Sequence, residues 1–178
     1  KMKSQNSRIC IVILINLLLI SLIALINSRL SVWGVFLYLP GLFIILSSNI
    51  LDVKNGIVAS IITGIHLDTL LHTPLGFHAI LLAFIFLLVR EWQENHRVFK
   101  TWRPIFLQII VNIIFFFVWY FWLLIKSPFA MSWEFSRFFA DLTISTLIMI
   151  PLGFWMTQLT EIFIHTNSQD GIDLKNHS

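Results

Sequence analysis

The chain has 178 residues, of which 57% are hydrophobic and only 12% are charged, and its formal net charge is +3. A soluble domain usually carries about 25% charged residues, so too few are present here to cover a water-facing surface. This composition excludes an ordinary soluble globular protein and predicts an all-α polytopic membrane protein. The positive residues are scattered through short inter-helix loops, so a nucleic-acid partner is not expected.

Two apolar segments open the chain. Residues 9–26 would span roughly 27 Å as a helix at ~1.5 Å per residue, which is enough for a bilayer core. Residues 32–51 form the second segment and contain Pro40 and Gly41. Because neighbouring helices can satisfy freed backbone groups, we expect a spanning helix with a kink at Pro40.

The next two segments, residues 57–67 and 75–89, are each shorter than a normal membrane span. They are compatible with two tilted helices joined by a tight turn at residues 73–76. They are also compatible with a re-entrant hairpin that never crosses the bilayer. The local pattern leaves both alternatives open.

Two longer segments follow. Residues 104–125 begin with Pro104, a residue favoured at the first position of a helix. Residues 138–164 carry Pro151 and Gly153 in their middle. The sequence therefore predicts a single six-helix transmembrane domain over residues 1–164, followed by a loosely ordered polar cytoplasmic tail over residues 165–178.

The distribution of Lys and Arg predicts the orientation. With six crossings and both termini in the cytoplasm, nine basic residues lie inside and three outside, which follows the positive-inside rule. The inner set is Lys1, Lys3, Arg8, Lys54, Arg90, Arg97, Lys100, Arg103 and Lys175, and the outer set is Arg29, Lys126 and Arg137. A re-entrant 57–89 pair would leave the 90–103 loop cytoplasmic too, so this count does not prove those crossings.

The polar stretch 64–78 lies between two apolar segments and contains His66, Asp68, His72 and His78. Polar groups at membrane depth are costly unless they are satisfied. Residues four apart share a helix face, so Asp68 could meet His72, and His78 could reach it across the turn. No spacing matches a specific zinc pattern, so no metal and no other cofactor is expected.

Asp68 is interpreted as the acceptor of structural hydrogen bonds that fix the hairpin, with a proton or ion relay as the less favoured reading. Asp141 is expected to be a solvated boundary charge, as is Glu161. Asn16 is expected to form hydrogen bonds between helices, and so is Asn112.

Close helix packing is predicted at the small-xxx-small pair Ser60 and Gly64. No motif of nucleophilic catalysis and no phosphate-binding loop occurs, so an enzyme is not expected. The basic, aromatic loop 90–103 is interpreted as a cytoplasmic loop that follows the charge rule, with binding of anionic headgroups as the alternative.

One stretch resembles a known family. Gly64 and Asp68, followed by Thr73, Pro74, Leu75, Gly76, His78 and Ala79, resemble the central segment of the bacterial rod shape-determining protein MreD family. Chain length, the number of spans and the charge pattern extend this resemblance weakly to the whole chain. His66 and His72 stand where the family usually has small or apolar residues.

The resemblance implies a non-enzymatic scaffold of the cell-wall elongation complex in the bacterial inner membrane. Implied partners are a bitopic MreC-like protein, a cytoskeletal MreB-like protein, a penicillin-binding protein and a membrane glycosyltransferase. Ser60, Gly64 and Asn112 are the candidate residues for docking against the single span of the MreC-like partner. The six-helix architecture is also similar to the substrate-binding subunit of energy-coupling-factor vitamin transporters. The first helix lacks the alanine pair of those subunits, since Ala24 has Ile20 four residues before it.

Overall fold

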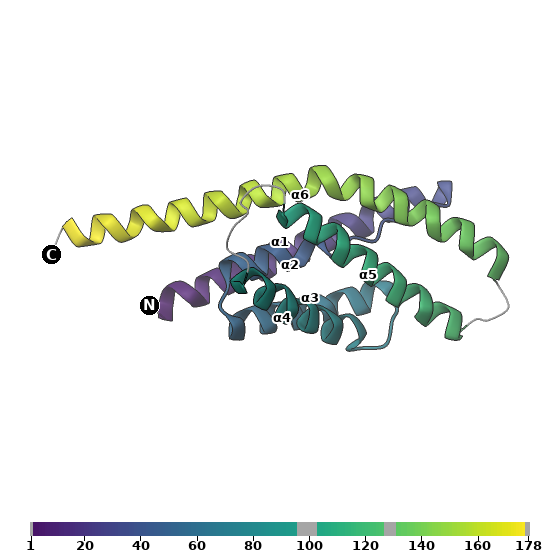
Figure 1. Cartoon of the computed structure of the whole chain (residues 1–178), viewed down its shortest axis with the longest axis horizontal. Coiled ribbons are helices and arrows are strands. Elements are labelled where there is room, and N and C mark those ends of the chain that lie inside the picture. Colours follow the sequence, from purple (N-terminus) through teal and green to yellow (C-terminus); the bar gives the residue numbers. More distant parts are fainter. Residues whose placement is uncertain (1, 96–102, 127–130, 177–178) are drawn as a thin grey trace.

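The structure is a computed structural model that describes residues 2–95, 103–126 and 131–176, with side chains described for residues 7–93, 105–126 and 135–162. Within these ranges all regular structure is helical. The elements, in chain order, are α1 (Met2–Leu30), the short 3-10 helix η1 (Ser31–Trp33), α2 (Leu42–Ile50), α3 (Val53–Leu71), α4 (Phe77–Asn95), α5 (Arg103–Lys126) and α6 (Met131–Asn176). Figure 1 shows them side by side along one long axis, with both termini at the same end.

Three of the described helices are long and apolar enough to cross a membrane. Their candidate spans are Ser7–Trp33, Ile105–Lys126 and Phe135–Ile162. Helices α3 and α4 have 19 residues each, about 28 Å at ~1.5 Å per residue, but polar and charged side chains interrupt their hydropathy. The structure therefore supports a helical membrane protein, and three of the six predicted crossings do not meet this criterion in the described chain.

The prediction of one continuous helix over residues 32–51 is wrong. The chain leaves η1, runs without helical structure through residues 35–39, turns at Pro40 and Gly41, and enters the nine-residue α2. Proline does not kink a continuous helix here but precedes a short, buried one. The physical reason is that side chains of other helices bind the backbone of residues 36–41, as described below.

Residues 165–176, for which the sequence predicts a loosely ordered polar tail, are helical in the structure. Helix α6 has 46 residues and continues through Pro151 to Asn176. No proline follows Pro151 in the sequence, so the strongest helix-breaking residue is missing from the rest of the chain.

Helices α3 and α4 form a closely packed antiparallel hairpin (Figure 1). A Cβ atom added at Gly64 would lie 2.3 Å from the Cα of Ala79, and one added at Gly56 would lie 2.0 Å from the Phe86 ring. The two helices approach this closely because glycine has no side chain, as in small-residue contacts between membrane helices.

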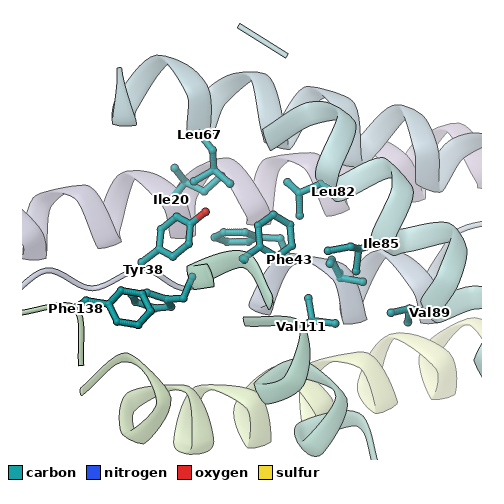
Figure 2. Packing of buried hydrophobic residues seen from close by; sticks show 12 residues of the cluster. Ile20, Tyr38, Phe43, Leu67, Leu82, Ile85, Val89, Val111 and Phe138 are labelled. Atoms are coloured by element: carbon teal, nitrogen blue, oxygen red, sulfur yellow. The ribbon is translucent and has the colours of Figure 1, made fainter. Parts of the chain in front are cut away.

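One buried cluster joins the hairpin to the rest of the molecule. Figure 2 shows Tyr38 near Ile20, Leu67 and Phe138, with Phe43 and side chains of α4 and α5 further along the same core. At the other end of the hairpin, Arg90 of α4 donates from Nη1 to the carbonyl oxygens of Ser48 (2.7 Å) and Leu51 (3.1 Å). A cation at the carboxyl end of α2 is favourable because the last carbonyls of a helix have no partner within it.

Candidate functional site

The site is a buried polar network around Asp68. Its Oδ1 accepts hydrogen bonds from the Thr73 hydroxyl (2.7 Å), the His78 backbone N–H (2.9 Å) and His78 Nδ1 (2.7 Å). Its Oδ2 accepts from the backbone N–H of Gly76 at 2.8 Å. Asp68 is only 1% exposed, so these four donors replace the water that the carboxylate loses.

The local sequence explains why the donors converge. Helix α3 ends at Leu71 and is capped by His72, whose φ of 52° reverses the chain in the left-handed conformation. Pro74 and Leu75 form the turn, and Gly76 has a φ of 99°, a value that side chains oppose. This turn points the N–H groups of Gly76 and His78 back toward Asp68, where the dipole of the amino end of α4 also favours a negative charge.

The network continues from the hairpin to the non-helical segment. His78 Nε2 lies 2.7 Å from the hydroxyl of Tyr38. Because Nδ1 faces the Asp68 carboxylate, the neutral imidazole carries its proton there, and Nε2 accepts from the Tyr38 O–H. Three buried polar side chains thus connect α3, α4 and residues 35–39.

Residues 36–41 are in turn held by side chains from three helices. Leu37 exchanges two hydrogen bonds with the amide of Asn27 on α1, at 2.7 and 2.8 Å. Asn112 of α5 donates to the carbonyl of Tyr38 (3.1 Å) and accepts from the N–H of Gly41 (3.3 Å).

Helix α6 supplies the remaining partners. Ser145 Oγ accepts from the N–H of Tyr38 (3.1 Å), and Asp141 Oδ1 accepts from the N–H of Phe36 (2.9 Å). Non-helical backbone is tolerated at membrane depth only when its polar groups are satisfied in this way. We call residues 35–39 the unwound segment.

The predicted motif residues fall into two groups. Gly64, Asp68, Gly76 and His78 take part in the packing or hydrogen bonds of the hairpin, whereas Pro74 and Leu75 form its exposed turn. The predicted packing residues Ser60, Gly64 and Asn112 are all buried inside the chain. They are therefore unavailable to the helix of a partner, which corrects their suggested use as docking residues.

The remaining polar residues differ in how well they match the predictions. Asp68 bonds His78 and not His72, which lies exposed at the end of α3. Asp141 is 6% exposed and bonds Phe36, so its interpretation as a solvated boundary charge is wrong, while Glu161 is exposed as expected. The helix-to-helix bond predicted for Asn16 is confirmed, since its Nδ2 donates to Thr63 Oγ1 at 3.1 Å.

Sequence reasoning missed Tyr38, Asn27, Asp141 and Ser145 as members of the site. One signal was present. Arg137, Asp141 and Ser145 are spaced four residues apart and so share a face of an otherwise apolar helix. No comparable local signal marks Tyr38, which lies in an apolar run.

The chemistry of the network is structural in character. The oxygen atoms of Asp68 and both ring nitrogens of His78 are engaged within the chain, and both residues are almost fully buried. Among the described residues, no group of three or more His, Cys, Asp or Glu is arranged to hold a metal ion. No model of a known protein family, no curated protein and no solved structure matches this chain.

Proposed function

We propose that this protein is a non-enzymatic scaffold subunit of a bacterial cell-wall elongation complex and that it binds an MreC-like bitopic membrane protein. It would cross the inner membrane six times, with both termini in the cytoplasm. The MreB-like filament, the penicillin-binding protein and the membrane glycosyltransferase would be further members of the same complex.

One observation carries the proposal. The residues that resemble the MreD motif form a single brace, in which Gly64 allows close packing and Asp68 binds the turn that ends at His78. A brace of this kind fixes the shape of a bundle and leaves its polar groups occupied. Such a role suits a protein that acts by presenting surfaces to partners.

The docking surface must then lie on an outward face, since the small and polar packing residues are internal. Helix α1 presents Leu14, Leu18, Leu22 and Leu25, each more than half exposed. Their spacing of three and four residues places them on one stripe of the helix. We assign the contact with the single span of the MreC-like partner to this α1 stripe.

Co-purification tests the proposal. The chain would be expressed with tagged MreC-like and MreB-like proteins and extracted in mild detergent. We expect co-elution with the MreC-like protein, which L18W together with L22W abolishes because bulky rings prevent close approach. Ile80→Trp is the matched control, since Ile80 is 74% exposed on α4, away from this stripe.

Two results would contradict the proposal. One is a chain that elutes alone from every co-expression. The other is a chain that co-purifies with a stoichiometric water-soluble vitamin, which would favour the transporter reading.

A further inference from the structure

A cavity of about 450 Å³ lies where the unwound segment meets α5, α6 and the end of α3. Five of the eleven residues that line it are aromatic. These are Phe36, Phe116, Trp119, Tyr120 and Phe138. The volume lies within the range of about 300–1,000 Å³ that is typical of small-molecule sites.

Neighbouring residues fix the orientation of two of these rings, Phe36 and Trp119. Trp119 stacks on Phe36, with centroids 5.7 Å apart and planes at 25°, and on Tyr38 at 5.1 Å and 22°. The backbone of Phe36 is fixed by Asp141, and the Tyr38 hydroxyl is fixed by His78. The stacked pair of Phe36 and Trp119 forms a pre-formed aromatic wall, which favours a planar ligand because offset stacking needs little rearrangement.

Two charged residues, Arg137 and Asp141, line the cavity. Asp141 is only 6% exposed, and its Oδ1 accepts a hydrogen bond from the N–H of Phe36. The Arg137 side chain is 59% exposed, with Nε 3.8 Å from Asp141 Oδ2. A guanidinium at such a position can bind a carboxylate with two parallel hydrogen bonds.

We propose that this cavity binds a small planar aromatic carboxylate, with the ring stacked against Trp119 and the carboxylate on Arg137. His72 also lines the cavity and adds a further donor for the anion. The site is independent of the scaffold role, since the α1 stripe lies on a different element. Binding of this ligand would stabilise the unwound segment, because Phe36 lines the cavity.

Calorimetry on the full chain in nanodiscs tests the site, with 2-naphthoate as the anionic probe and 2-naphthalenemethanol as its neutral analogue. We expect saturable binding of 2-naphthoate and at least tenfold weaker binding of the alcohol. Arg137→Gln should weaken 2-naphthoate binding at least tenfold and leave the alcohol unaffected. Trp119→Leu should weaken both.

Arg29→Gln is the matched control, because Arg29 is an exposed basic residue that does not line the cavity. It should bind 2-naphthoate as the parent does, and thermal unfolding should show that R137Q is folded. The proposal is overturned if the probe binds the parent no better than empty nanodiscs, or if folded R137Q binds it with unchanged affinity. It is also overturned if native mass spectrometry finds a phospholipid that 2-naphthoate does not displace.

Discussion

At Asp68, a single carboxylate organises eleven residues of chain. Its four hydrogen bonds come from Thr73, Gly76 and His78, all within ten residues of it. An ionised acceptor makes stronger bonds than a neutral one, and leaving a buried donor unpaired costs more than forming the bond gains. The geometry of the turn therefore stabilises the ionised carboxylate, and the carboxylate in return stabilises the conformation of the turn.

Asp68→Asn should destabilise the fold by about 2–4 kcal/mol, the range expected when a charge-assisted network loses its charge and one donor its partner. The amide can offer its oxygen to the three donors at the Oδ1 position. Its NH₂ group would then face the N–H of Gly76, so two donors would meet. Thermal unfolding in detergent, followed by intrinsic fluorescence, measures the effect.

Asp52→Asn provides the comparison. Asp52 is exposed at the amino end of α3, and its side chain makes no capping hydrogen bond, so little change is expected. An unfolding midpoint for D68N equal to that of D52N would contradict the brace. A normally folded D68N chain with a lost transport activity would instead favour the relay that was the weaker reading of the sequence.

At the scale of elements, the unwound segment marks the limit of what the sequence predicts. The long helices α1, α5 and α6 follow from apolar runs, because hydropathy is a property of consecutive residues. Residues 35–39 are equally apolar, and periodicity cannot distinguish a buried helix from a buried extended strand. Their conformation depends on hydrogen bonds from residues as distant as Asn112 and Ser145, which no local pattern encodes.

Asn112→Leu should release the unwound segment and destabilise the protein by about 2–4 kcal/mol, since two buried backbone groups lose their partners. These groups are the carbonyl of Tyr38 and the N–H of Gly41. The midpoint of thermal unfolding checks the effect. Asn49→Leu makes the same substitution at an exposed position, where it removes only a solvent-exposed hydrogen bond from Gln93, and should change the midpoint little. Equal shifts in the two variants would argue against the role of Asn112.

The candidate site could be predicted only in part. Asp68, Gly76 and His78 stand out because acids and turn residues are rare between apolar segments. The partner Tyr38 lies 40 residues from His78 in the sequence, and a tyrosine in an apolar run has no distinguishing feature. Tyr38 and His78 come together only through tertiary packing, so the sequence does not predict their contact.

Gly64→Ala should separate the hairpin, because the new methyl group would lie 2.3–2.7 Å from backbone atoms of His78 and Ala79, which cannot rotate away. We expect a loss of at least about 1–3 kcal/mol, the usual effect of overpacking. Val58→Ile also adds one methyl group to α3, at a position that is 45% exposed, and should be neutral. If both variants unfold at the same temperature, the close contact is not important for stability.

At the scale of the whole molecule, the proposed six crossings require that the second one is a broken span. If residues 35–39 rise ~3.3 Å each, as in an extended chain, they and the nine residues of α2 at ~1.5 Å each span about 30 Å, the thickness of a bilayer core. The two termini lie at the same end of the molecule, as an even number of crossings needs (Figure 1). The brace would then hold the hairpin against this broken span near the outer surface.

Cysteine labelling distinguishes two crossings at α3 and α4 from a re-entrant pair. Cys10 is the single cysteine, so a Cys10→Ser background is free of thiols. In intact spheroplasts, a membrane-impermeant maleimide should label Leu75→Cys, since Leu75 is 77% exposed in the α3–α4 turn, which six crossings place outside. Lys54→Cys, at the other end of α3, should react only after permeabilisation. If neither site reacts before permeabilisation and both react after it, the hairpin does not cross, and the charge distribution alone then supports the orientation.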